Sequence, residues 1–172
     1  VAPKRCGHTR GKRTVDREEA FARVRAAVDA RSSGADILVM ARTDANATEG
    51  FEEAIYRANK FVELGVDITF LEAPRNEDEM RAYCDRVPGP KMANMVEQGD
   101  TPVLPPEELQ EIGYKIAIYP ITLMLAGIRA MENALAALRE GRMPADSAEF
   151  AHLRDIVGFP QYYEDEKRYA AE

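Results

Sequence analysis

The sequence predicts an α/β protein with a parallel sheet. Four short apolar runs lie near residues 37, 68, 92 and 116, and a stretch with helical spacing of its apolar residues follows each. Such alternation is typical of successive β/α units, whose crossovers are right-handed. Flavodoxin-like sheets and (β/α)8 barrels both use this unit, and a barrel takes about 250 residues and eight units. At 172 residues, the chain would supply half of a barrel.

A capping signal predicts the first helix, and a continuous apolar run predicts the first strand. Asp16 and Glu19 form a capping box, which predicts a helix that ends at Gly34. The continuous apolar run 36–41 predicts a strand covered on both faces, as in a parallel sheet. The elements expected next are a helix over 48–64, a strand over 67–71, a helix over 76–86, a strand over 91–93, a short helix ending near Gly113 and a strand over 115–118.

The C-terminal part is predicted to be helical. A long helix is expected over 121–140, and Gly141 ends it. Residues 146–157 indicate one more helix, whereas 159–172 are aromatic and charged without a clear period. The apolar residues of the long helix are Leu123, Ile128, Met131, Leu135 and Leu138.

Composition narrows the class of protein. The net charge of -7 and the pI near 5.0 argue against general nucleic-acid binding. No run of 18 apolar residues predicts a membrane span, and the first residues do not form a secretory leader. Cys6 and Cys84 are the only two cysteines, which favours the reducing cytoplasm over a disulfide framework. A chain that starts on Val1 without Met also suggests processing, truncation or an incomplete record.

A basic segment at the N-terminus carries the first candidate site. Five Lys or Arg residues and His8 surround Cys6 within residues 3–13. Positive charge stabilises a thiolate, so it lowers the pKa of a cysteine from about 8.5 toward neutral pH. One interpretation is a loop that presents Cys6 to an anionic substrate as a proton donor or acceptor. The alternative is a flexible basic tail in which the cysteine is incidental.

Polar side chains end three of the four predicted strands. Arg42, Glu72 and Asn94 each follow an apolar run. In parallel α/β folds, ligands bind at the carboxyl ends of the strands. Each residue alone has a structural alternative, since an Arg there often forms a salt bridge and a Glu often caps a helix. Three such residues on successive strands, together with the Cys6 segment, favour a site.

These motifs resemble the isocitrate lyase and phosphoenolpyruvate mutase superfamily, in its order and spacing from residue 3 to about 165. The resemblance implies a (β/α)8 barrel of which this chain is the part after the fourth strand. Residues 1–15 would form the catalytic loop, 16–140 the second half of the barrel, and 141–172 a helical segment exchanged between subunits of a dimer, usually within a tetramer. The matching motifs are 4–8 (KRCGH), 41–44 (ARTD), 70–74 (FLEAP), 94–97 (NMVE) and 118–120 (IYP).

The family's metal is expected to depend on residues outside this chain. The resemblance implies Mg2+ bound by carboxylates of the early strands, so no metal ligand is assigned here. Four β/α units alone would leave two bare sheet edges and an uncovered core face. We therefore expect an upstream segment, the N-terminal half of the barrel, to belong with this chain.

The resemblance also implies roles for individual residues. Cys6 would protonate the enolate-like fragment left when a carbon–carbon bond breaks, with Lys4 and His8 tuning its pKa. Arg5 and Gly7 of the same loop would contact the substrate. Arg42 would bind a substrate carboxylate, and Glu72 would lie near the C2 oxygen or the water around the metal. The departing carboxylate would be held by Asn94 and the backbone of Met95 and Val96.

The expected substrate is a small malate-like 2-hydroxy dicarboxylate. Family members that cleave tricarboxylates such as methylisocitrate carry two further arginines, where Leu125 and Phe150 stand in this chain. A third carboxylate would therefore lack a counter-charge, which favours a substrate of the 2,3-dimethylmalate type. Oxaloacetate decarboxylation, phosphonate chemistry of the carboxyphosphonoenolpyruvate mutase type and an inactive half-barrel remain alternatives.

Overall fold

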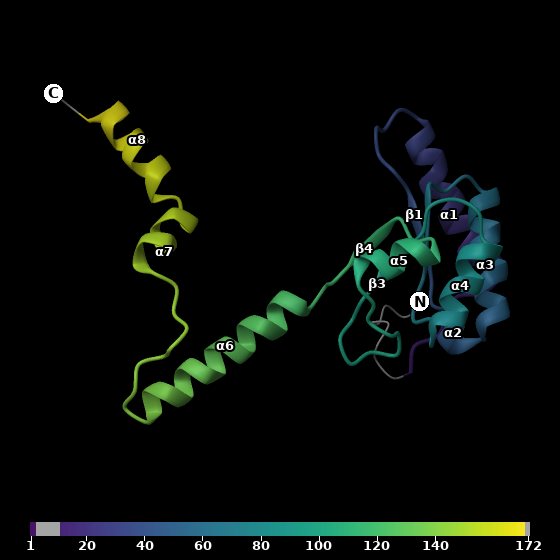
Figure 1. Ribbon diagram of the computed structural model, residues 1–172. Helices are drawn as coiled ribbons and strands as arrows, with labels where there is room; N and C mark the ends of the chain where they lie inside the picture. Colours follow the sequence, from purple (N-terminus) through teal and green to yellow (C-terminus); the bar gives the residue numbers. More distant parts are fainter. Residues whose placement is uncertain (3–10, 171–172) are drawn as a thin grey trace. The chain divides into compact units, whose positions relative to one another are not determined.

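The computed structural model describes residues 1–2 and 11–170, in two compact units (Figure 1). The first unit is Val1–Leu123 and the second is Met124–Glu172. The predictions for Lys4, Arg5, Cys6, Gly7 and His8 fall outside the described residues. The division into a loop, a half-barrel and an exchanged segment stays a prediction.

Four parallel strands form the centre of the first unit. They are β1 (Met40–Thr43), β2 (Ile68–Leu71), β3 (Met92–Asn94) and β4 (Ile116–Ile118). β1 pairs with β2 and β3 pairs with β4, both in parallel register. A parallel bridge between Thr69 and Lys91 joins the two pairs, so the strands follow one another in chain order. The predicted α/β fold with parallel strands is therefore confirmed.

Helices follow the strands in the predicted alternation. In the first unit they are α1 (Arg17–Ser32), α2 (Ala45–Thr48), α3 (Phe51–Glu63), α4 (Glu77–Arg86) and α5 (Pro106–Ile112). The Asp16 carboxylate accepts the Glu19 N–H at 2.8 Å, which confirms the capping of α1. Gly113 ends α5 with a φ of 119°, a conformation that glycine adopts without steric cost.

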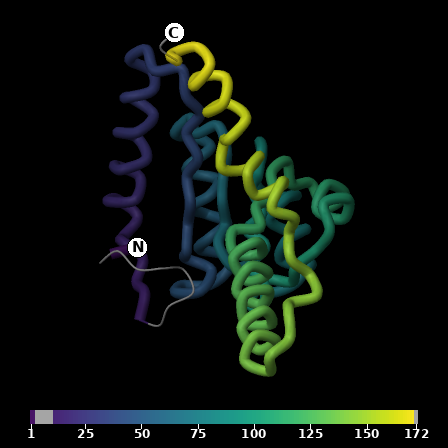
Figure 2. Tube along the Cα trace, turned by 90° about the vertical axis from the view of Figure 1, so that its left-hand side faces the viewer, coloured from purple at the N-terminus to yellow at the C-terminus, as the bar shows by residue number. Residues whose placement is uncertain are grey.

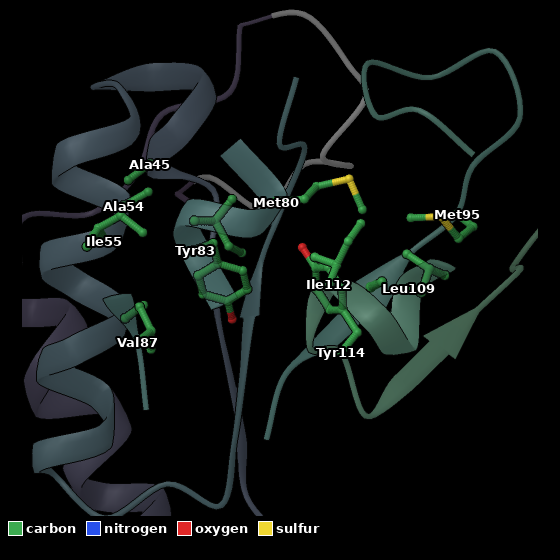
Figure 3. Close-up of a cluster of buried hydrophobic side chains, with 13 residues drawn as sticks. Ala45, Ala54, Ile55, Met80, Tyr83, Val87, Met95, Leu109, Ile112 and Tyr114 are labelled. Atoms are coloured by element: carbon green, nitrogen blue, oxygen red, sulfur yellow. The ribbon is translucent and has the colours of Figure 1, made fainter. Parts of the chain in front are cut away.

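One hydrophobic core lies between the helices and one face of the strands. Side chains from α3, α4, α5 and the strands meet there, with Met80 and Tyr83 of α4 fully buried (Figure 3). The Tyr83 hydroxyl donates to the Thr69 hydroxyl of β2 at 2.7 Å, so its buried polar group is satisfied. The ring of Phe21 in α1 packs against Phe61 in α3, and Figure 2 shows α1 in purple along this side of the first unit.

The first strand differs from its prediction. β1 begins at Met40, not at residue 36, and Ile37 and Leu38 are 61% and 72% exposed. Burial alternates along β1, because α3 covers the face of Ala41 whereas nothing described covers the face of Met40. The prediction of a strand covered on both faces is therefore wrong for β1 within the described residues. It fits β2, which is buried along its whole length.

The expected helix over 48–64 is α3, which begins at Phe51, and the separate short helix α2 before it is not predicted. Gly50 has a φ of 102° and separates α2 from α3. A right-handed helix requires negative φ throughout, so it cannot pass through this residue. The short helix α2 therefore begins directly after β1, at Ala45, and it becomes part of the strand-end region described below.

The second unit contains α6 (Thr122–Arg139) from Met124 onward, together with α7 (Phe150–Ile156) and α8 (Phe159–Tyr169). The predicted apolar residues of α6 are all exposed, from 43% at Ile128 to 87% at Leu123. No helix is predicted over 159–172, because the apolar residues there show no clear period, yet α8 forms there. That helix carries Phe159 and Tyr163 one turn apart, and their ring centroids lie 5.8 Å apart. Across the described part of the chain, no helix is long and apolar enough to cross a membrane.

Candidate active site

The three predicted strand-end residues lie together at the carboxyl ends of β1, β2 and β3. A guanidinium nitrogen of Arg42 lies 3.6 Å from a carboxylate oxygen of Glu72. The Asn94 amide donates to the same oxygen at 3.4 Å. Their strands pair in parallel, so their ends meet at one edge of the sheet. The structure therefore places these side chains where ligands bind in such folds.

The Glu72 carboxylate is almost completely removed from solvent. Its residue is 1% exposed, whereas the Arg42 side chain is 38% exposed. A buried carboxylate is costly unless charge and hydrogen bonds compensate it, and Arg42 and Asn94 provide part of this. The Arg42 guanidinium also lies over the Phe70 ring, 5.0 Å from its centroid. The Arg42 side chain therefore extends from the buried Glu72 carboxylate to the protein surface.

Asp44 also belongs to this region, although the sequence alone predicts no role for it. Arg42 donates two hydrogen bonds to its carboxylate, at 2.7 and 2.8 Å. Lys12 contacts the same carboxylate at 3.2 Å. Burial alone would raise the pKa of Asp44, but the hydrogen bonds and charge of Arg42 and Lys12 outweigh it and lower the pKa below its usual value. The available signal was its spacing, since residues 42 and 44 lie two apart at a strand end.

Replacing Asp44 with Asn should destabilise the protein at neutral pH by roughly 1–3 kcal/mol, because a buried charged pair loses one partner. A lowered folded-state pKa gives stability above the unfolded-state pKa, and this stability is lost as the pH falls through the folded-state pKa. The difference between wild type and variant should therefore shrink in acid. Urea unfolding at pH 7 and pH 3 measures it. Asp36→Asn, at an exposed residue, is the control. An equal loss of stability in Asp36→Asn would contradict the stabilising role of the pair that Asp44 forms with Arg42.

The residues on both sides of segment 3–10 are fixed near this site. The Ala2 N–H donates to the Arg13 carbonyl at 3.0 Å, so residues 2 and 13 are neighbours. Lys12 reaches the end of β1 through Asp44. The buried guanidinium of Arg57 on α3 donates to the Val15 carbonyl at 2.8 Å. Lys12 therefore lies beside the carboxyl end of β1, and Arg13 next to it pairs with Ala2.

The end of β3 differs in one detail from its prediction. The Met95 N–H donates to the Ile118 carbonyl at 2.8 Å and so belongs to the sheet. The Met95 side chain is buried in the helix-facing core (Figure 3). This backbone donor is therefore not available to a carboxylate, and the predicted role falls on Asn94 and Val96. The Asn94 amide oxygen is buried and has no hydrogen-bond partner among the described residues.

The described residues do not make a metal site by themselves. Within residues 1–2 and 11–170, no group of three or more His, Cys, Asp or Glu side chains is placed to hold an ion. Glu72 and Asn94 offer oxygen atoms, which suit Mg2+, but Mg2+ prefers six ligands. Any metal at this edge would need further ligands.

The whole strand region agrees with one family. The sequence matches the family model for phosphoenolpyruvate phosphomutase over residues 4–139, which includes the basic Cys6 segment and all four strand ends. The chain belongs to the phosphoenolpyruvate phosphomutase family. The resemblance that the sequence motifs indicated is thereby confirmed.

Relatives within the phosphoenolpyruvate phosphomutase family are lyases and mutases. The chain is 39% identical to 2,3-dimethylmalate lyase of Eubacterium barkeri, over 99% of this chain and 60% of that protein. It is 40% identical to 2-methylisocitrate lyase of Aeropyrum pernix, over 94% and 53%. It is 38% identical to the chloroplastic carboxyvinyl-carboxyphosphonate phosphorylmutase of Arabidopsis thaliana, over 98% and 51%. The chain thus spans about half to three-fifths of the length of these relatives.

The fold agrees with solved structures of the same superfamily. A structure of oxaloacetate acetylhydrolase in complex with the inhibitor 3,3-difluorooxalacetate matches with a TM-score of 0.89 and 29% identity. It covers all of this chain, which spans 59% of that structure. The described α/β arrangement is therefore that of the superfamily.

Proposed function

We propose that this chain is the C-terminal half of a Mg2+-dependent carbon–carbon lyase. Its substrate would be a malate-like 2-hydroxy dicarboxylate, and its products a 2-oxo acid such as pyruvate and a carboxylate. The observation that carries the proposal is the grouping of Arg42, Glu72 and Asn94 at adjacent strand ends, in a chain of this family. Arg42, Asn94 and Lys12 provide anion-binding groups, and Glu72 is a carboxylate beside them.

The bond-breaking step is a retro-aldol cleavage. The C2 hydroxyl loses its proton to a base, for which Glu72 is the candidate among the described residues. The C2–C3 bond then breaks, and C2 becomes the ketone carbon of pyruvate. The electron pair of the broken bond stays on C3. Mg2+, whose main ligands we expect upstream, would hold the oxygens of the 2-oxo acid. Arg42 suits bidentate binding of a substrate carboxylate, and Asn94 suits binding of the departing one.

Protonation of C3 completes the reaction, and we assign it to Cys6. A thiol whose pKa lies near ambient pH is an effective general acid. Lys4, Arg5 and His8 supply the positive charge that lowers the pKa and compensates the dianion, and Gly7 lets the backbone approach the substrate. Cys6 stands six positions before Lys12, so the chain length allows at most about 20 Å between their Cα atoms. The proposal requires Cys6 to reach the strand ends, and this chain length permits it.

The proposal includes an upstream half-barrel and a second copy of the chain. β1 and β4 each lack a further strand among the described residues. The face with Met40 and Ile118 is exposed, as is the apolar face of α6. A partner half-barrel would complete a (β/α)8 barrel, and exchanged C-terminal helices in a dimer of dimers would cover α6. A purified 19.2 kDa monomer by mass spectrometry and gel filtration would contradict this assembly.

The function is tested with the complete protein, meaning this chain together with its upstream segment. With Mg2+, racemic 2,3-dimethylmalate should give pyruvate and propionate, and methylisocitrate should react at least about tenfold more slowly, since Leu125 and Phe150 cannot pair with a third carboxylate. Coupled pyruvate detection and NMR of the products measure both rates. Preferred turnover of methylisocitrate would contradict the substrate assignment, and no turnover of either would contradict the function.

A second candidate is chemistry on oxaloacetate at the same site. The structural likeness to oxaloacetate acetylhydrolase, with a TM-score of 0.89, favours it. Decarboxylation of oxaloacetate needs less from Cys6 than carbon–carbon cleavage of a hydroxy acid. Oxaloacetate turnover that exceeds dimethylmalate turnover and survives Cys6→Ala would select this candidate.

A further inference from the structure

The chain leaves β2 through an unfavourable backbone conformation. Ala73 lies between Glu72 and Pro74 and has a φ of 56°. A residue other than glycine held in the left-handed region costs of order 1–3 kcal/mol. A residue before proline is also driven toward extended conformations. Both effects oppose the observed turn, so neighbouring groups must hold it.

Asn46 of α2 provides the main restraint. Its side chain is fully buried, and its amide nitrogen donates to the Ala73 carbonyl at 2.8 Å. The same nitrogen donates to a carboxylate oxygen of Glu79 at 3.0 Å. Both partners are acceptors, so only the nitrogen of the amide group fits between them.

Two further hydrogen bonds close this arrangement around the turn. The Arg75 N–H donates to the same Glu79 oxygen at 2.8 Å. The Arg75 guanidinium donates to the backbone carbonyl of Asn46 at 3.1 Å. The turn after β2 is therefore tied to α2 on one side and to α4 on the other.

The restrained residue directly follows Glu72. The Glu72 N–H donates to the Thr43 carbonyl at 3.0 Å, which continues the pairing of β1 with β2. Beyond it the backbone turns at Ala73, whose carbonyl is held by Asn46, so the chain is restrained on both sides of the residue that carries the carboxylate. In the observed conformation this carboxylate meets Arg42 and Asn94.

We propose that Asn46 is a positioning residue that holds Ala73 in the left-handed conformation and thereby fixes the Glu72 carboxylate in the site. The inference rests on the proposed function of Glu72. It assigns no contact between Asn46 and substrate. Its effect is on the catalytic step, because a carboxylate displaced by about 1 Å costs up to about 100-fold in rate.

The first test measures kcat and KM of Asn46→Ala in the complete protein. We expect kcat to fall by about tenfold or more, with KM within about twofold, because substrate-binding groups are untouched. Asn59→Ala is the matched control, since the Asn59 amide donates within its own helix α3, to the Ile55 carbonyl at 3.0 Å. If Asn46→Ala does not fold, Asn46→Ser is measured in its place. An unchanged kcat in the folded variant would overturn the proposal.

The second test is rescue by glycine. Glycine adopts the left-handed region without steric cost, so Ala73→Gly removes the need for the restraint. The double variant Asn46→Ala with Ala73→Gly should recover kcat to within about threefold of wild type. A merely structural role for Asn46 would not be rescued at residue 73. A folded double variant that stays as slow as Asn46→Ala would overturn the proposal.

A measurement that does not depend on enzyme activity separates this inference from the proposed function. Amide hydrogen exchange at Glu72 should accelerate in Asn46→Ala, return toward wild type in the double variant and stay unchanged in Asn59→Ala. If the wild-type protein cleaves no hydroxy acid, the proposed function fails, and exchange at Glu72 still decides whether Asn46 fixes the strand end. Unchanged exchange at Glu72 in Asn46→Ala would refute the restraint.

Discussion

Replacing Cys6 with Ser is expected to lower kcat of the complete protein for dimethylmalate by about 100-fold or more. A hydroxyl has nearly the shape of a thiol but is a far weaker acid, so proton delivery to C3 should fail while binding remains. KM should stay within about twofold, because an interaction made only in the transition state is removed. Initial rates over a range of substrate concentrations measure both constants.

The other cysteine provides a matched control. Cys84 on α4 is half-buried, and burial raises its pKa to about 11, so it is poorly suited to proton transfer at neutral pH. Cys84→Ser should therefore leave kcat within about twofold of wild type. A Cys6→Ser variant that loses binding but keeps its kcat would contradict the role of proton donor. Equal losses of kcat from both replacements would do the same.

Replacing Arg42 with Lys should raise KM by about 10- to 100-fold, with a smaller effect on kcat. Lysine keeps the positive charge but not the planar fork that binds a carboxylate through two nitrogens. The side chain would also lose its paired hydrogen bonds to Asp44, which orient it toward Glu72. The loss of a bidentate charged contact corresponds to roughly 1.5–3 kcal/mol, which sets the expected range.

The control for Arg42 is an arginine outside the strand ends. Arg81 on α4 is exposed and lies 3.5 Å from Glu77 one turn away, a contact of little energetic weight. Arg81→Lys should leave both constants unchanged. If Arg42→Lys behaves like this control under saturating Mg2+, Arg42 does not bind the substrate carboxylate.

The sequence was most informative where local signals and periodicity agree. Asp16 and Asn76 cap their helices through the residue three positions later, as their side chains predict. The apolar runs at 67–71 and 115–118 become parallel strands, and Leu71 of β2 and Ala117 of β4 pack in the core that α3, α4 and α5 share. These signals depend on neighbours in sequence, which is why they could be read without a structure.

The remaining features depend on contacts between distant residues. The run 36–41 looks fully buried, yet Ile37 and Leu38 are exposed, because the sequence does not show which faces of a strand find a partner. The pairing of Lys12 with Asp44 joins positions 32 residues apart and leaves no local trace. The grouping of Arg42 with Glu72 was foreseeable only because parallel strands bring their carboxyl ends together.

The most direct test of carbon protonation by Cys6 is product analysis in D2O. The complete protein is incubated with Mg2+ and 2,3-dimethylmalate, and the propionate is examined by proton NMR. Cleavage followed by a single protonation predicts pyruvate and propionate in equal amounts, with one deuterium at C2 of the propionate. The rate of propionate formation should fall strongly in Cys6→Ser. Propionate without deuterium, or an unchanged rate in Cys6→Ser, would contradict it.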